Sequence, residues 1–299
     1  MRTLLFFLLV SSVPGWTQPP PRFLLDADTA NEIDDLYAIA HLLADTTVDL
    51  RGLTSAQWFH HLSGDSTCYR SQQLNEDLLR IAGKLDGVPH PMGAEMIMGK
   101  PWGGYEPRDS PAAQFIIQEA RDAAAAGEKL VVMSIGAATN LASALALAPD
   151  ITEHVVAYQL GLRYNVEGRY WDKSDFNTRR DLNAMNYLLN QGGLELHVMP
   201  VTTAIQYKWP RDSTYALFDR ADEMGRYLKQ RWETKAAHNH ERIMWDVAAL
   251  QALLKPEQAT EITVATPPEN THRTVHVFTD IDEAAMQRDY WERLPNYAK

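Results

Sequence analysis

The chain has 299 residues, of which 45% are hydrophobic, and a formal net charge of −11 at neutral pH. This length allows one large core or two modest ones. The acidic balance argues against a nucleic-acid partner, because binding to phosphates requires basic faces. Cys68 is the only cysteine, so core burial rather than internal disulfide bonding must stabilise the fold.

The N-terminal segment has the pattern of a secretory signal peptide. A basic residue, Arg2, precedes an apolar run from Leu4 to Val10, and small and turn-forming residues follow. This run is too short to cross a bilayer as a helix; the alternative is a buried N-terminal strand. We therefore expect a signal peptide at residues 1–18, a secreted or periplasmic mature domain at residues 19–299, and no membrane attachment after cleavage.

Short apolar runs alternate with longer amphipathic segments in the order of strand–helix units. In chain order we predict strand 23–25, helix 34–44, strand 50–54, helix 71–82, an extended piece at 88–93, helix 112–126, strand 130–133, helix 140–147, strand 155–160, helix 181–190, strand 196–201, helices 215–240 and 242–254, strand 274–278 and helix 282–294. This order favours one α/β domain with a doubly wound, mostly parallel central sheet and helices on both faces.

The densest group of functional residue types follows the first predicted strand. Five acidic residues, Asp26, Asp28, Glu32, Asp34 and Asp35, fall within ten positions. Ligands of open α/β sheets bind beyond the carboxyl ends of the strands, where this segment begins. Neighbouring carboxylates repel one another unless a cation is bound, and hard oxygen donors favour Ca²⁺ or Mg²⁺. The group predicts a metal site, whereas a single aspartate would more simply cap the helix.

Several segments together resemble the inosine–uridine-preferring nucleoside hydrolase family. Members open with a strand followed by Asp-x-Asp-x-Gly-x-Asp-Asp, and this chain has Asp26-x-Asp28 and Asp34-Asp35. Further matches follow in the family's order: HPMGA at 90–94, SIGAATNL at 134–141, DFN at 175–177 followed by Asp181, and WDVAA at 245–249. The resemblance runs from about Arg22 onward and implies a Rossmann-like nucleoside hydrolase fold.

The resemblance implies a role for each matching residue. The side chains of Asp28, Asp35 and Asp246 and the backbone carbonyl of Ile135 would bind Ca²⁺, together with the sugar diol and a water. Asp28 would also accept a proton from that water. The residues expected to hold sugar hydroxyls are Asp34, Asp175 and Asn177. The resemblance thus implies hydrolysis of the N-glycosidic bond of nucleosides or related N-ribosides, and we expect a homo-oligomer, either a dimer or a tetramer.

The chain departs from the family pattern in the acidic loop and near the sugar contacts. Asp28 and Asp34 are six positions apart instead of four, so the loop must bulge, and Asn31 or Glu32 could enter the site. The family's Gly-Asn after the second strand is replaced by residues 54–59, which removes one sugar contact. Asn165 is a weak candidate for the asparagine that precedes the DFN segment. The substrate therefore need not be a standard nucleoside.

The residue before the late aspartate bears on the leaving group. Pyrimidine-accepting family members have a histidine there as general acid, whereas this chain has Trp245, as purine-preferring members do. An indole can stack on a base but cannot protonate it. We predict purine preference, with Trp245 as one stacking surface and Trp58 as a second; both could instead be ordinary core aromatics.

The sequence is also compatible with two other functions. Residues 24–29 also resemble the first motif of haloacid dehalogenase-type phosphatases, in which Asp26 would be the nucleophile and Mg²⁺ the metal. Alternatively, the altered loop could leave a non-catalytic, calcium-bound protein that binds sugars or nucleosides. His60-His61 and His238-x-His240 lack companions at metal-ligand spacing, so we expect structural or surface roles for them.

Overall fold

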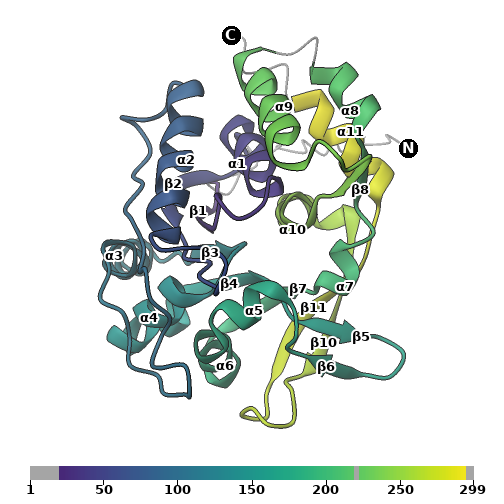
Figure 1. Ribbon diagram of the computed structural model, residues 1–299. Coiled ribbons are helices and arrows are strands. Elements are labelled where there is room, and N and C mark those ends of the chain that lie inside the picture. The colour runs from purple at the N-terminus through teal and green to yellow at the C-terminus, as the bar shows by residue number, and fades with distance from the viewer. Residues whose placement is uncertain (1–19, 219–221, 294–299) are drawn as a thin grey trace, which may run out of the picture.

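A seven-stranded sheet runs through the structure, a computed structural model that describes residues 20–218 and 222–293. The predicted signal peptide lies outside these residues. The strand order is β10 (Ala259–Ala265), β11 (Thr274–Ile281), β7 (Glu195–Met199), β4 (Val155–Leu160), β3 (Leu130–Ser134), β1 (Arg22–Ala27) and β2 (Asp49–Ser55) (Figure 1). All neighbours pair in parallel except β10, which runs antiparallel to β11 at the edge. The predicted, mostly parallel sheet is confirmed.

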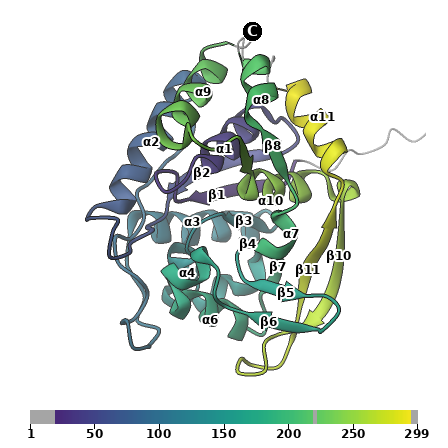
Figure 2. The same cartoon turned by 45° about the vertical axis from the view of Figure 1, so that its right-hand side comes forward.

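Helices cover both faces of this sheet (Figure 2), as predicted. A hydrophobic core lies on each face of the sheet, and alternate residues of β1 point into different cores. Phe23 and Leu25 point into the first, and Leu24 points into the second. The helices that contribute to the first core are α1 (Asp34–Ala44), α2 (Thr67–Ile81), α9 (Glu223–Ala236), α10 (Trp245–Leu254) and α11 (Glu283–Arg293). Those that contribute to the second are α3 (Pro111–Ala125), α4 (Thr139–Leu147) and α6 (Leu182–Asn190).

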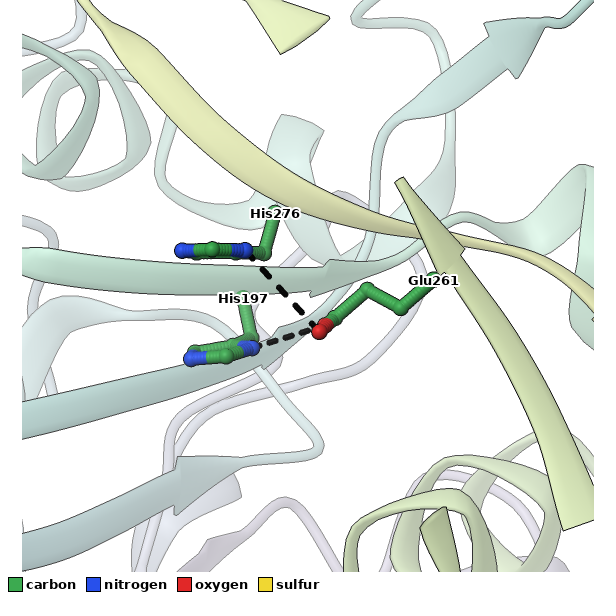
Figure 3. A group of neighbouring side chains, drawn as sticks. All are labelled: His197, Glu261 and His276. Atoms are coloured by element: carbon green, nitrogen blue, oxygen red, sulfur yellow. Dashed lines mark hydrogen bonds and ion pairs between the residues drawn. The ribbon is translucent and has the colours of Figure 1, made fainter. Parts of the chain in front are cut away.

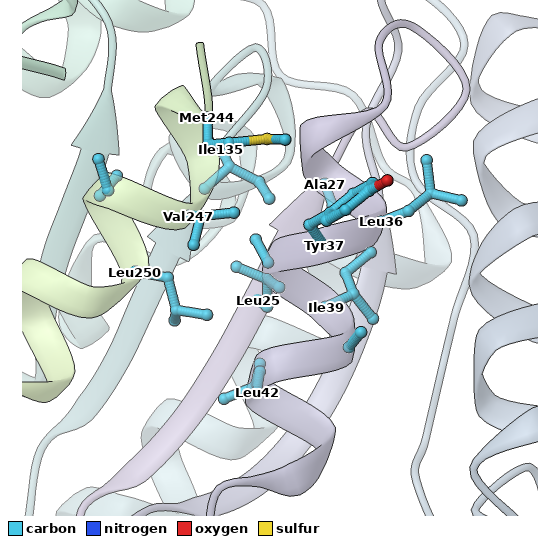
Figure 4. Close-up of a cluster of buried hydrophobic side chains, with 14 of the residues drawn as sticks. Leu25, Ala27, Leu36, Tyr37, Ile39, Leu42, Ile135, Met244, Val247 and Leu250 are labelled. Carbon is cyan, nitrogen blue, oxygen red and sulfur yellow. The ribbon is translucent and has the colours of Figure 1, made fainter. Parts of the chain in front are cut away.

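The helices α1 and α10 converge over β1 and position the site at its end. Figure 4 shows Leu25 of β1 between Ile39 of α1 and Val247 of α10, and all three side chains are fully buried. Burying a side chain of this size contributes roughly 1.5–3 kcal/mol. The hydroxyl of Tyr37 donates to the Leu228 carbonyl at 3.1 Å, which ties α1 to α9. This packing fixes both helix N-termini beside the sheet.

The remaining elements surround the carboxyl edge of the sheet or connect its parts. They are 3₁₀ helices at Pro149–His154 and Pro256–Gln258, β5 (Arg163–Asn165), β6 (Tyr170–Asp172), α5 (Phe176–Arg180), α7 (Val201–Ala204), β8 (Lys208–Pro210), α8 (Arg211–Phe218) and β9 (Glu241–Ile243). β5 pairs with β6, and β8 pairs with β9. None of the described helices is long and apolar enough to cross a membrane.

Two predicted helices differ in extent from those of the structure. The helix predicted at 215–240 is divided: α8 ends at Phe218, and α9 begins after Asp222, whose carboxylate accepts the Gly225 N–H. The helix predicted at 242–254 begins only at Trp245, because the residues before it form β9. The piece at 88–93 predicted as extended makes an isolated parallel bridge between Met92 and Ser55 of β2.

Candidate active site

A pocket of about 190 Å³ lies beyond the carboxyl ends of the central strands. Asp28 follows β1, Ile135 follows β3, and Leu160 ends β4. The first two residues of α10, Trp245 and Asp246, complete the wall. Loops at this edge of a parallel sheet are the usual ligand site of the doubly wound fold.

Four aspartates form the acidic part of the pocket. Asp28, Asp34, Asp35 and Asp246 are each at most 4% exposed. One carboxylate oxygen from each of Asp34, Asp35 and Asp246 lies within 4.8 Å of the others. The backbone N–H of Asp246 also donates to Oδ2 of Asp34 at 3.2 Å. The fold thus joins the acidic segment after β1 to an aspartate more than two hundred residues along the chain, as the sequence predicted.

The electrostatics of these four carboxyls suit a bound cation. Burial raises the pKa of Asp34 to about 6, and it raises the pKa values of Asp28, Asp35 and Asp246 well above their ordinary range. Repulsion among neighbouring carboxylates adds to the effect of burial. Oδ2 of Asp28, Oδ1 of Asp34 and Oδ1 of Asp35 are buried without a hydrogen-bond partner. Unpartnered, buried oxygen donors are the ligand set that a hard cation requires.

The loop after β3 approaches Asp28 closely. A Cβ on Gly136 would lie 2.9 Å from Cβ of Asp28 and 3.0 Å from its Oδ1. Only glycine therefore allows the Ile135–Gly136 backbone to pass so near this carboxylate. The Ile135 carbonyl, which is one of the predicted metal ligands, accepts a hydrogen bond from the Asn177 side-chain amide at 2.8 Å. Asn177 thus fixes a backbone group of the site.

Asp175 and Asn177, which were predicted to bind sugar hydroxyls, both line the pocket but also hold the backbone in place. Asp175 is the N-cap of α5: its Oδ1 accepts the Thr178 N–H at 3.0 Å, and its Oδ2 accepts the Leu162 N–H at 2.7 Å. The amide of Asn177 also donates to the Leu160 carbonyl at 3.2 Å. These contacts orient α5 toward the pocket.

The longer acidic loop places both of its inserted polar residues at the pocket. Asn31 lines it and is held by a hydrogen bond from its N–H to the Asp28 carbonyl at 2.8 Å. Glu32 lines it too and forms an ion pair with Arg242 of β9. The guanidinium of Arg242 also lies 3.8 Å from Oδ1 of Asp34 and offsets part of the rise that burial causes in the pKa of that carboxyl. Sequence reasoning missed Arg242, because nothing in its local sequence marks a contact two hundred residues away.

Only one of the three remaining predicted substrate-binding residues lines the pocket. Trp245 lines the pocket, but Trp58 and Asn165 lie outside its lining. The ring of Trp58 is covered by the Arg70 guanidinium at 4.6 Å, and the Asn165 side chain accepts the Gly168 N–H in the β5–β6 turn. Lining residues that were not predicted are Leu160, Arg163, Phe176, Val201 and Ile205. No histidine of the described residues lines the pocket.

Asp26 has a structural position, which argues against the phosphatase alternative. It is fully buried and does not line the pocket. Its Oδ1 accepts hydrogen bonds from Thr54 Oγ1 at 2.6 Å and Asn140 Nδ2 at 2.9 Å, and burial raises its pKa to about 6. A nucleophilic aspartate must reach its substrate, whereas this one links β1 to β2 and α4.

The fold and site define a doubly wound α/β protein with a buried, metal-type carboxylate centre at the carboxyl edge of its sheet. Residues 23–296 match the family model of the inosine-uridine preferring nucleoside hydrolases. The chain belongs to this family and is accordingly an N-glycosyl hydrolase. No curated protein matches the sequence significantly.

Solved structures of low sequence identity share the fold over nearly the whole chain. A plant nucleoside hydrolase aligns with a TM-score of 0.71 at 18% identity, covering 93% of this chain and 99% of its own. A purine-preferring ribonucleoside hydrolase from Gardnerella vaginalis gives 0.69 at 20% identity with the same coverage. An inosine-uridine preferring nucleoside hydrolase from Bacillus anthracis gives 0.66 at 17% identity, again with coverage of 93% and 99%.

Proposed function

We propose that this protein is a calcium-dependent nucleoside hydrolase that prefers purine nucleosides. The observation that carries the proposal is the group of four buried aspartates, three of which have an unpartnered oxygen, in one pocket with Trp245. The family membership supplies the reaction, which is hydrolysis of the N-glycosidic bond. Calcium and the base preference are inferred from the residues of this chain.

Ca²⁺ fits the donor set of the pocket. Asp34, Asp35 and Asp246 bring carboxylate oxygens within reach of one ion, and Asp28 and the Ile135 carbonyl line the same pocket, so all of these groups offer only oxygen atoms. Ca²⁺ takes six to eight oxygen ligands in irregular geometry, so protein groups, a sugar diol and water can bind together. When bound, the cation supplies Lewis acidity that lowers the pKa of a water ligand.

The residues of the pocket have separate tasks in the proposed reaction. Oδ2 of Asp28 has no hydrogen-bond partner and is the acceptor for the proton of the attacking water. Asp34, Asp175 and Asn177 orient the sugar through its hydroxyls. N-glycosidic cleavage passes through an oxocarbenium-like transition state, and the surrounding carboxylates stabilise its developing positive charge.

The purine preference follows from the absence of a suitable acid. Among the described residues that line the pocket there is no histidine, and Trp245 has no acidic proton for a leaving base. A purine can take its proton from solvent at N7, and stacking on Trp245 stabilises the cationic ring. A pyrimidine has no comparable site, so its cleavage should be slower by about 10²–10⁴, the usual contribution of one general acid.

Comparing inosine with uridine as substrates of the calcium-loaded enzyme tests this proposal. We expect a much higher kcat/KM for inosine. Trp245→Ala should lower kcat/KM for inosine far more than it lowers calcium affinity, whereas Trp102→Ala, at a side chain 84% exposed, should change neither. Equal rates for both nucleosides would contradict the purine preference. Binding of nucleosides without release of ribose would favour the non-catalytic alternative.

We also propose that the mature protein is exported and forms a homo-oligomer. The export proposal rests on the basic, apolar and turn-forming pattern of residues 1–18. N-terminal sequencing of protein recovered from the periplasm or medium should begin near Thr17–Gln18. Light scattering on the purified protein would distinguish a dimer or tetramer from a monomer.

A further inference from the structure

Three potential metal ligands lie together on the sheet, outside the pocket. They are His197 of β7, His276 of β11 and Glu261 of the edge strand β10 (Figure 3). His276 is the direct cross-strand partner of His197, and Glu261 pairs with Phe278, two positions beyond His276. Because side chains alternate along a strand, this register puts all three on one face of the sheet. The backbone of three adjacent strands therefore positions the group.

Both imidazole rings lie close to the carboxylate of Glu261. Nδ1 of His197 lies 2.7 Å from Oε1 of Glu261, and Nδ1 of His276 lies 3.9 Å from Oε2. One donor atom from each of the three residues lies within 4.8 Å of the others. Figure 3 shows both rings presenting the same edge to Glu261. Glu195 lies at the opposite side of the His197 ring, with Oε1 3.4 Å from Nε2.

We propose that His197, Glu261 and His276 form a binding site for a divalent transition-metal ion of the zinc type. Two imidazoles and a carboxylate are a common zinc donor set, and nitrogen ligands disfavour Ca²⁺. In a tetrahedral site with bonds of about 2.0–2.1 Å, ligand atoms are about 3.3 Å apart. The two nitrogen–oxygen distances, 2.7 and 3.9 Å, lie on either side of this value.

Binding requires both imidazole rings to rotate. The two rings are stacked, with centroids 4.5 Å apart and planes inclined by 14°, so each must rotate to direct Nδ1 at a shared ion. His276 and Glu261 are partly exposed and can move, and water can occupy a fourth position. The Tyr158 ring stacks on the other face of the His197 ring, with the two ring centroids 4.3 Å apart. A proton on Nδ1 of His197 would leave as the ion binds, while Glu195 would accept the Nε2–H and orient the ring.

The proposed site has a structural consequence for the sheet. β10 is the antiparallel edge strand, and most of its residues are exposed. An ion held by Glu261, His276 and His197 would connect this edge to the two strands beside it. Because such an ion binds the folded sheet and not the separated strands, it should raise thermal stability.

Titration of untagged, calcium-saturated protein with Co²⁺ tests the proposal, because the visible spectrum of Co²⁺ reports its coordination. We expect one ion with a tetrahedral spectrum, displaced by Zn²⁺. His276→Ala and Glu261→Gln should each weaken binding at least tenfold. His272→Ala, which removes an exposed histidine of the same β10–β11 hairpin, should leave it unchanged. Excess Ca²⁺ is added to occupy the carboxylate pocket. The substitutions lie outside that pocket, so the differences among these variants report on the sheet site even if the calcium proposal fails.

Three results would contradict this metal site. Absence of Co²⁺ binding by the wild-type protein would exclude the site. Equal binding by wild type, His276→Ala and Glu261→Gln would place the ion elsewhere. As a second readout, Zn²⁺ at a hundredfold excess over its Kd should raise the thermal midpoint of the wild type by about 5 °C. A rise of the same size in His276→Ala would also contradict the proposal.

Discussion

At the scale of single residues, Asp26 and Asp28 show how two nearby carboxyls acquire different tasks. Asp26 is still within β1, and the side chains of Thr54 and Asn140 donate to one of its oxygens. Asp28 lies past the strand end and lines the pocket. Their positions relative to the end of the strand therefore separate a structural residue from a catalytic candidate.

Asp28→Asn should abolish turnover while leaving the fold intact. The amide has nearly the same volume but cannot accept the proton of the attacking water, so kcat should fall by at least about 10². Steady-state kinetics with inosine, together with circular dichroism, would measure both effects. Asp65→Asn, at an exposed position, is the matched control and should keep wild-type activity. Near-normal kcat in Asp28→Asn would show that another group is the base.

At the scale of elements, strands and helices with strong apolar periodicity were predictable from sequence. Helix α1 has the predicted bounds of 34–44, and β4 those of 155–160. The edge strand β10 was missed because most of its side chains are exposed, so it lacks an apolar run. β9 was read as part of a helix because a three-residue strand has no period of its own; its pairing with β8 decides its conformation.

The candidate site was predictable where its residues follow each other in sequence, and less so where the fold brings them together. The acidic segment indicated Asp28, Asp34 and Asp35 directly, and the family pattern added Asp246. Arg242 and Arg163 have no such local pattern; they reach the pocket because short hairpins place them there. The role of Gly136 depends on a distance to Asp28 that only the packed structure provides.

The contact between α1 and α11 should make the protein sensitive to acid. His41 of α1 stacks on Tyr290 of α11 with ring centroids 5.0 Å apart, and burial lowers its pKa to about 4. In the unfolded chain a histidine titrates near 6.5, so as the pH falls through this window the unfolded state takes up the proton first. Stability should therefore be lost between about pH 6.5 and pH 4.

His41→Phe tests this contact because phenylalanine keeps a ring against Tyr290 but cannot titrate. Between pH 7 and pH 5, the wild type should lose about 2 kcal/mol more unfolding free energy than the variant. Urea unfolding at both pH values would measure the two losses. Their difference isolates His41, because the other titrating groups are the same in both proteins and their contributions largely cancel. Parallel losses in the two proteins would show that His41 is not responsible.

At the scale of the whole molecule, the carboxylate centre joins distant parts of the chain. Asp28, Asp34 and Asp35 come from its first β–α unit, and Asp246 begins a helix near the other end. Their side chains are buried together, so their repulsion acts against the packing of α1 beside α10. A cation at this point would relieve the repulsion and stabilise the entire fold rather than one loop.

Removal of calcium should therefore lower global stability, and the effect should depend on pH. At a hundredfold excess over its Kd, Ca²⁺ should contribute about 2.7 kcal/mol, which corresponds to a rise in Tm of about 5 °C. Burial raises the pKa of Asp34 to about 6 in the metal-free protein, so protons compete with the ion as the pH falls. The rise in Tm on adding Ca²⁺ should be larger at pH 7.5 than at pH 5. Asp246→Asn should reduce it, while Asp65→Asn should preserve it; a Tm that is unchanged by Ca²⁺ at pH 7.5 would contradict a calcium centre built from these aspartates.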